Sequence, residues 1–292
     1  MSFTITETAS QPSCWRRALD LVVTGLPERG ERVAVIGCGT SRHMAHAYAV
    51  LRESRGHGET DVFAAAELPL HRRYDRVLAI TRSGTTTEVL DALAALRDTP
   101  RTVLTAVPDG PAAAVAEHLV VLDFADERSI VQTRFATTAL MLLRAHLGAS
   151  SEHLAAQAEL ALAEELPPAA TTAEQITFLG TGWAAALADE AALKVREAAG
   201  LWTESYSAKE YRHGPVSVTG PGRVVWFLDT PPPGLCERIA ATGGTAILPT
   251  LDPMAELVRV HRLAVERAER AGLDPDKPRH LTRSVVLTGA EA

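Results

Sequence analysis

The sequence has little cysteine and no long uninterrupted run of apolar residues. Its three cysteines, Cys14, Cys38 and Cys236, match no zinc-binding spacing, and an odd number is a poor framework for disulfides. We therefore expect no metal site and a reducing, cytoplasmic compartment. No stretch reaches the roughly 18 apolar residues that a membrane-spanning helix needs, so we expect no contact with a membrane.

An excess of positive charge is also absent. The formal net charge is −7 over 292 residues, which argues against nucleic acid as a partner, because non-specific binding to nucleic acid needs a basic surface. Residues 1–17 lack a basic region followed by an apolar run, so we expect no signal peptide. Hydrophobic residues make up 46% of the chain, enough for a sizeable core, and the length suits two compact domains.

Short apolar segments alternate with helical patterns along the first half of the chain. Strands that are apolar almost throughout, separated by helices of roughly 10–15 residues, are typical of a parallel sheet covered by helices on both faces. The fold class that we predict is therefore α/β. The expected strands lie within 32–41, 60–68, 75–80, 101–107 and 118–124, and the expected helices are 13–26, 42–54, 85–99, 134–149 and 152–166.

The second half of the chain repeats this organisation. Residues 167–175 contain two prolines followed by small polar residues, which is typical of a linker. After them, 175–197 matches 32–53, with an apolar strand, a Gly-x-Gly turn and a helix rich in small residues, and 223–239 matches 76–93. Because the matches keep their order, they favour an internal duplication. The alternative is a chance likeness between α/β units, which all share strand–glycine–helix turns.

The stretch LAITRSGTTTEVL, residues 78–90, is unusually rich in hydroxyl groups and follows an expected strand. Ligands of open α/β sheets bind where the parallel strands end, and the next helix offers unpaired N–H groups and the positive end of its dipole. Gly84 lets the backbone approach a ligand, and Thr81, Ser83 and Thr86 are short donors, so the stretch suits a phosphate. The alternative is a plain helix cap, for which one hydroxyl would be enough.

The second copy differs at this place. It has Asp229 and three prolines, 231–233, where the first copy has its hydroxyls. Prolines have no N–H to donate, and an aspartate would repel an anion, so we expect phosphate binding in the first copy alone. Within the first copy, Arg82 could pair with the phosphate or point to solvent.

A second polar turn, GCGTS at residues 37–41, follows the first expected strand. The third glycine of a dinucleotide fingerprint is missing, so a dinucleotide-dependent reductase is disfavoured. Thr40 and Ser41 instead suit contacts to a sugar or a phosphate. Cys38 could be a nucleophile, but a small packed thiol is the more common role.

The segment 192–216 carries the densest set of charged side chains. Lys194 and Glu197 lie three residues apart on an expected helix and therefore share a face. His213 follows, before a Gly-Pro break. A carboxylate beside a lysine and a histidine could transfer protons on a sugar phosphate. A solvated, salt-bridged helix face would have the same composition, and the residues alone leave both interpretations open.

Taken together, these segments resemble the double sugar-isomerase (SIS) domain family. The family includes the isomerase half of glutamine–fructose-6-phosphate transaminase and stand-alone isomerases, deaminases and deglycases of amino-sugar phosphates. The resemblance extends from about residue 13 to residue 288. It is carried by five motifs in order: CGTS-x-H (38–43), SGTTTEV (83–89), ALKVRE (192–197), E-x-YRHGP (210–215) and DPDKPRHLTRSV (274–285).

The resemblance implies two tandem flavodoxin-like SIS subdomains, at 13–167 and 168–292, and an isomerase or deaminase that transfers a proton between C1 and C2 of a phosphosugar. Glu197 would be the catalytic carboxylate, Lys194 the lysine beside it, and His213 the ring-opening histidine. Dimerisation is implied too, with His213 reaching the neighbouring subunit's site. No metal or organic cofactor is expected. The residues expected to line the sugar and phosphate pocket are Cys38, Gly39, Thr40, Ser41, Thr81, Arg82, Ser83 and Thr86.

Three departures from the family pattern narrow this expectation. No amidotransferase half precedes residue 13, so we expect no glutaminase activity. Arg283 occupies the position of the synthase's imine-forming lysine, and arginine is a poor imine former because it stays protonated, so we expect acid–base enolisation. Gln132 replaces a pocket serine, so we expect the sugar ligand to be contacted differently. Gln132 and Arg283 are both expected to belong to the substrate- and phosphate-binding site.

A non-catalytic sugar-phosphate sensor is the alternative function. SIS modules also occur as ligand-binding domains of transcription regulators. The sequence has no basic extension for binding DNA, which counts against a self-contained regulator. Glu197, which a binding protein would not need, is present.

Overall fold

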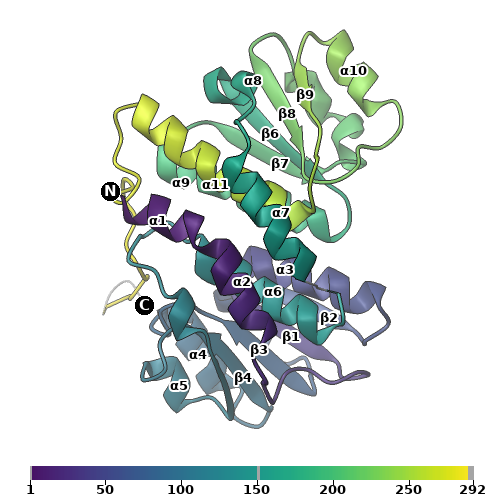
Figure 1. The fold of residues 1–292 in the computed structure, drawn as a ribbon. Coiled ribbons are helices and arrows are strands. Elements are labelled where there is room, and N and C mark those ends of the chain that lie inside the picture. The colour runs from purple at the N-terminus through teal and green to yellow at the C-terminus, as the bar shows by residue number, and fades with distance from the viewer. Residues whose placement is uncertain (1, 150–151, 289–292) are drawn as a thin grey trace. The chain divides into compact units, whose positions relative to one another are not determined.

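The computed structural model describes residues 2–149 and 152–288 (Figure 1). Two compact units make up this part of the chain. The five-stranded unit contains residues 13–127, 134–149 and 282–288, and the four-stranded unit contains residues 2–12, 128–133 and 152–281.

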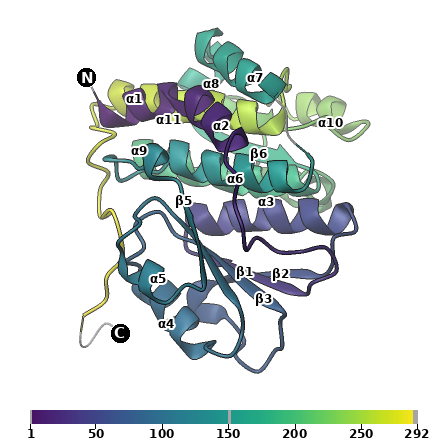
Figure 2. The same cartoon turned by 60° about the horizontal axis from the view of Figure 1, so that its bottom comes forward.

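The five-stranded unit has one wholly parallel sheet in the order β2-β1-β3-β4-β5. This is the flavodoxin-like order. Figure 2 shows α3 and α6 on one face of the sheet and α4 and α5 on the other. The strands are β1 (Val33–Gly37), β2 (Thr60–Ala64), β3 (Arg76–Ile80), β4 (Arg101–Thr105) and β5 (His118–Val121). The helices are α2 (Gln11–Leu19), α3 (Thr40–Ser54), α4 (Thr87–Ala95), α5 (Pro111–Ala114) and α6 (Arg134–His146), with short 3₁₀ turns η1 (Ala65–Glu67) and η2 (Asp123–Ala125).

The four-stranded unit repeats that topology without its last strand. Its sheet is parallel, in the order β7-β6-β8-β9. The strands are β6 (Gln175–Gly180), β7 (Thr203–Ser207), β8 (Arg223–Phe227) and β9 (Thr245–Ile247). The helices are α1 (Phe3–Ala9), α7 (Glu152–Ala163), α8 (Pro168–Thr172), α9 (Trp183–Ala199), α10 (Leu235–Ala241) and α11 (Pro253–Arg270), with 3₁₀ turns η3 (Glu210–His213) and η4 (Pro215–Val218). The predicted α/β fold of two parallel-sheet subdomains is confirmed.

The two Gly-x-Gly turns adopt the same backbone conformation. Gly39 has φ 53° and ψ −127°, and Gly182 has φ 54° and ψ −127°, a region that residues with a side chain rarely enter. The preceding glycines need their lack of a side chain for another reason. A Cβ on Gly37 would lie 2.9 Å from the Ser41 backbone, and one on Gly180 would lie 2.3 Å from the Ala184 carbonyl oxygen. This identity of backbone supports the inferred duplication.

The prediction of a linker at 167–175 was wrong in part, because α8 occupies Pro168–Thr172. Proline suits the first position of a helix, where its missing N–H has no partner to lose. Helices α1 and α11 and strand β7 were not predicted from the sequence. For α11 the signals were present: the Asp252 side chain accepts a hydrogen bond from Met254 N at 3.0 Å, and Pro253 opens the helix.

The compact units do not follow the order of the chain. Helix α7 packs against α11 and so belongs to the four-stranded unit, whereas residues 282–288 belong to the five-stranded unit. The subdomain boundaries 13–167 and 168–292 concern the repeat in the sequence and stay a prediction.

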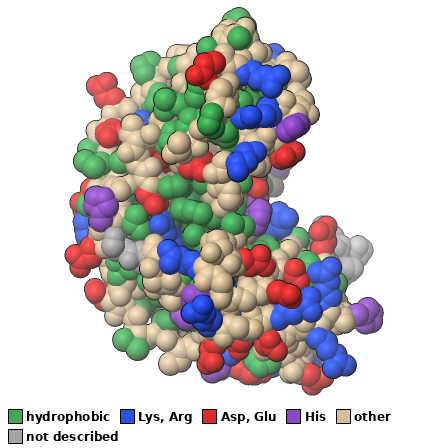
Figure 3. Space-filling model, turned by 90° about the vertical axis from the view of Figure 1, so that its right-hand side faces the viewer, with side chains coloured by type: hydrophobic (Ala, Val, Ile, Leu, Met, Phe, Trp, Pro, Cys, Tyr) green, Lys and Arg blue, Asp and Glu red, His purple; other side chains and the backbone are tan. Residues whose placement is uncertain are grey.

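The distribution of surface charge and the composition of the helices bear on the expected partners. Figure 3 shows acidic and basic side chains interspersed with hydrophobic ones over the face that it displays. Within residues 2–149 and 152–288, no helix combines the length and the apolar character needed to cross a membrane.

Candidate active site

The hydroxyl-rich loop, residues 81–86, connects the end of β3 to the start of α4. Thr81, Arg82 and Ser83 are buried, and Gly84 has φ +66°, the left-handed conformation that turns the chain into the helix. Ser83 Oγ accepts a hydrogen bond from Thr85 N at 3.3 Å and so fixes the turn. Thr86 occupies the N-cap position, but its side chain makes no capping hydrogen bond. The plain-cap alternative therefore does not describe this loop.

The hydroxyl groups of the loop converge on a residue from the far end of the chain. Ser284 Oγ lies 3.1 Å from Ser83 Oγ, 2.9 Å from Thr85 Oγ1 and 3.4 Å from Thr86 Oγ1. Sequence reasoning missed Ser284. The only signal was its place beside Arg283 in the last motif.

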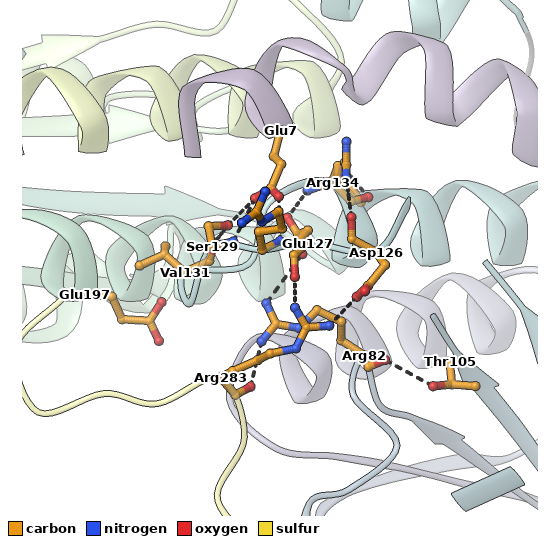
Figure 4. A network of polar contacts seen from close by, with 12 residues as sticks. Glu7, Arg82, Thr105, Asp126, Glu127, Ser129, Val131, Arg134, Glu197 and Arg283 are labelled. Carbon is orange, nitrogen blue, oxygen red and sulfur yellow. Dashed lines mark hydrogen bonds and ion pairs between the residues drawn. The ribbon is translucent and has the colours of Figure 1, made fainter. Parts of the chain in front are cut away.

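Arg82 does not point to solvent, since its side chain is buried. Its guanidinium lies 3.9 Å from Glu127 Oε2, and both side chains are almost completely buried (1% and 0% exposed). Arg82 Nη2 also donates to the Arg283 carbonyl oxygen at 2.6 Å (Figure 4). A buried guanidinium needs a counter-charge, and Glu127 supplies it. The solvent-facing alternative for Arg82 is thus wrong.

Arg283 points toward the segment before α6. Its Nη2 lies 2.6 Å from Asp126 Oδ1, and its Nη1 donates to the Glu127 carbonyl oxygen (Figure 4). The guanidinium is therefore engaged in holding its own segment against residues 126–127. Sequence reasoning singled out neither Asp126 nor Glu127, because no motif contains them.

The glycine turn at 37–41 lies at the same edge of the sheet as the hydroxyl-rich loop. β1 and β3 are neighbouring parallel strands, so the loops that follow them are adjacent. Thr40 and Ser41 begin α3 and are buried. Burial is the main cause that raises the pKa of the Cys38 thiol, and a protonated thiol is a poor nucleophile. This supports the packed-thiol interpretation of Cys38.

In the four-stranded unit, Asp229 fills the place that corresponds to the hydroxyl-rich loop. Its carboxylate accepts a hydrogen bond from Thr181 N at 3.0 Å and another from Thr181 Oγ1. The second copy therefore satisfies its own donors with a side-chain carboxylate. Burial raises the pKa of Asp229, and the Thr181 hydrogen bonds oppose that shift.

Lys194 and Glu197 form a close ion pair on α9. Lys194 Nζ lies 2.6 Å from Glu197 Oε2 and 3.4 Å from Glu190 Oε1. Lys194 is 1% exposed and Glu197 is 20% exposed. Since a solvated helix face would expose the lysine, the alternative of a surface salt bridge is wrong for this pair.

Glu197 lines a pocket of about 460 Å³ within the four-stranded unit. Arg196, Asp274, Lys277 and Arg279 also line it. The pocket therefore combines a partly exposed carboxylate with cationic side chains, a setting in which a carboxylate can exchange protons with an anionic ligand.

Two further predicted residues belong to the four-stranded unit. His213 is exposed on η3, directly before Gly214, which has φ 145°. The Gln132 side-chain oxygen Oε1 is buried and has no hydrogen-bond partner among residues 2–149 and 152–288. A buried acceptor without a partner is costly, which makes it a suitable contact for a ligand hydroxyl.

The chain is similar in sequence to glutamine–fructose-6-phosphate aminotransferases. The enzyme of Methanothermobacter thermautotrophicus is 29% identical over 344 aligned residues, which cover 98% of this chain and 57% of that protein. The enzyme of Sulfurisphaera tokodaii is 26% identical and is covered over 52% of its length. The chain thus spans little more than half the length of the curated relatives it matches. No family model matches the chain.

Solved structures show the same fold. The glucosamine-6-phosphate deaminase of Thermotoga maritima superimposes with a TM-score of 0.82 at 24% identity, covering 98% of this chain and 100% of that one. The C-terminal domain of the Francisella tularensis glucosamine-fructose-6-phosphate aminotransferase also gives 0.82, at 17% identity, covering 95% and 98%. The architecture shared with these structures is α/β, with two parallel sheets flanked by helices. The similarity in sequence and in fold supports the resemblance to the double sugar-isomerase (SIS) domain family that the motifs predicted.

Proposed function

We propose that the protein is a phosphosugar isomerase or deaminase. Its substrate would be an amino-sugar phosphate or a fructosamine-type ketose phosphate. The observation that carries this proposal is Glu197, a partly exposed carboxylate that a buried lysine holds at 2.6 Å beside a pocket. The names of the relatives, isomerizing aminotransferases and a deaminase, support the same reaction class.

The proposed reaction is acid–base proton transfer by Glu197. The carboxylate removes the proton from C2 of the ring-opened aldose while the carbonyl oxygen O1 gains a proton, which leaves an enediol or its amine analogue. Return of the C2 proton to C1, with loss of a proton from O2, gives the ketose. Where C2 carries an amine, the same step with loss of a proton from the nitrogen gives an imine, which water hydrolyses to the ketone and ammonia. Lys194 keeps Glu197 oriented and counter-charged. This chemistry needs no metal or organic cofactor.

Binding is assigned to other residues. Thr81, Ser83 and Thr86 of the hydroxyl-rich loop would hold the phosphate, because hydroxyl donors at a helix N-terminus suit a dianion. Cys38, Gly39, Thr40 and Ser41 would border the sugar, and the unpartnered Gln132 oxygen would accept a hydrogen bond from one of its hydroxyls. Arg82 and Arg283 would act indirectly, because each is already engaged by acidic or carbonyl groups.

A homodimer completes the proposal. His213 is exposed on η3 and would assist ring opening in the neighbouring subunit's site. Arg283 in place of a lysine excludes an imine at that position, so the enzyme would hold the sugar without a covalent bond. Borohydride treatment in the presence of substrate should then leave no reduced adduct on any lysine.

A ligand panel tests the substrate class. We expect hexosamine 6-phosphates or fructosamine-type 6-phosphate conjugates to raise the melting temperature, whereas the unphosphorylated sugars, NAD and NADP should not. Each ligand that binds is then incubated with the protein while ammonia and ketose phosphate are measured. Binding without any turnover would favour the sugar-phosphate sensor, and no binding of any phosphosugar would contradict both functions.

A further inference from the structure

A strap, defined here as residues 282–287, lies against the hydroxyl-rich loop. Ser284 places its hydroxyl within 2.9–3.4 Å of the hydroxyl oxygens of Ser83, Thr85 and Thr86. The strap also contacts Thr87, the first residue of α4. Thr87 N donates to the Val285 carbonyl oxygen at 3.2 Å, and Leu287 N donates to Thr87 Oγ1 at 2.9 Å.

The strap is held in place by contacts that do not involve the hydroxyl cluster. Arg82 Nη2 donates to the Arg283 carbonyl oxygen at 2.6 Å, and Arg283 pairs with Asp126 at 2.6 Å. Arg283 also donates to the Glu127 carbonyl oxygen (Figure 4). The strap is therefore held at Arg283 both by the main-chain carbonyl and by the side-chain guanidinium. Charge-assisted hydrogen bonds of this kind are among the stronger contacts in proteins. They would hold Ser284 at the loop whether or not the loop is occupied.

The hydroxyl cluster can change partners without moving its heavy atoms. A serine or threonine hydroxyl carries one proton that rotates freely about the C–O bond. In the structure these hydroxyls hydrogen-bond to one another, since each is both donor and acceptor. A phosphate dianion accepts hydrogen bonds only, so each proton could turn toward it while the oxygens stay in place.

We propose that Ser284 is a phosphate ligand, a fourth hydroxyl that the strap adds to the donors of the loop, and that Arg283 with Asp126 positions it. The inference rests on the proposed phosphosugar function. The opposite role would be a plug, in which Ser284 occupies the phosphate site and has to leave. A plug would depend on the cluster for its attachment, whereas the strap has its own contacts at Asp126, Glu127 and Thr87.

The test measures affinity for inorganic phosphate and for glucosamine 6-phosphate by calorimetry. Ser284→Ala should weaken both by about tenfold, the effect of one hydrogen bond to a charged group. Asp126→Asn should weaken both to a smaller extent, because it loosens the strap but keeps the hydroxyl. Thr288→Ala is the matched control: it removes an exposed hydroxyl just beyond the strap and should change neither affinity.

Two comparisons separate this inference from the function on which it rests. If the wild-type protein binds neither ligand, the phosphosugar function and the role of Ser284 are both refuted. If Ser83→Ala abolishes binding and Ser284→Ala leaves it unchanged or makes it tighter, the role of Ser284 is refuted and the phosphosugar function stands. Trypsin cleavage after Arg283 is a second measurement. Phosphate should protect the strap from cleavage if Ser284 is a ligand, and faster cleavage with phosphate would show a plug.

Discussion

Glu127 is a fully buried carboxylate that contacts two separate segments of the five-stranded unit. Its Oε1 accepts a hydrogen bond from Arg134 N at 2.7 Å, and its Oε2 faces the buried Arg82 guanidinium. The first contact satisfies an N–H at the start of α6, and the second compensates a charge that has no access to water. Glu127 therefore stabilises the hydroxyl-rich loop through Arg82, although it belongs to no motif.

Removing the charge of Glu127 should destabilise the protein strongly. Glu127→Gln keeps the shape but removes the buried negative charge that faces the Arg82 guanidinium, and we expect a loss of about 3 kcal/mol or more in the free energy of unfolding. Denaturant titration measures it. The control is Glu117→Gln, whose partner Arg101 lies 3.3 Å away and whose side chain is 46% exposed, where we expect less than about 1 kcal/mol. Equal effects of the two substitutions would refute the account of Arg82.

Helices α9 and α11 bury polar groups where they pack together. Lys194 on α9 is buried, and His261 on α11 is 2% exposed, with Nδ1 at 3.1 Å from Gln11 Nε2. Desolvation by burial, with the Lys194 charge adding to it, lowers the pKa of His261 to about 3. The α9–α11 contact thus requires a neutral imidazole beside a charged lysine.

This packing predicts a loss of stability in acid. The unfolded histidine titrates near 6.5 and the folded one near 3, so the unfolded state binds the extra proton in that interval. Stability should fall as the pH drops from about 6.5 to about 3, by about 2–3 kcal/mol between pH 7 and pH 4.5 from this group. His261→Asn should reduce the pH dependence by that amount, while His71→Asn, at an exposed histidine, should leave it unchanged. If the stability of His261→Asn depends on pH as strongly as that of wild type, the low pKa assigned to His261 is contradicted.

Across the whole molecule, local patterns in the sequence predicted most elements and the two polar turns that follow β1 and β3. Strand alternation and glycine spacing are local signals, so the strands of the first sheet and the repeated turn at Gly39 and Gly182 followed from the residues. The contacts of Ser284 could not be predicted from the sequence, because its partner Ser83 lies 201 residues away. Nothing in the spacing of a chain encodes such a pairing. The same holds for the pair of Arg283 and Asp126, 157 residues apart.

The function proposed for the whole molecule depends on one carboxylate, Glu197. The most direct test compares wild type with Glu197→Gln on the phosphosugar that the panel identifies. Removing a general base lowers turnover by about 10²–10⁴-fold, while the affinity for the ligand should stay within about threefold, because the phosphate contacts are untouched. Glu197→Gln with unchanged turnover would contradict the account.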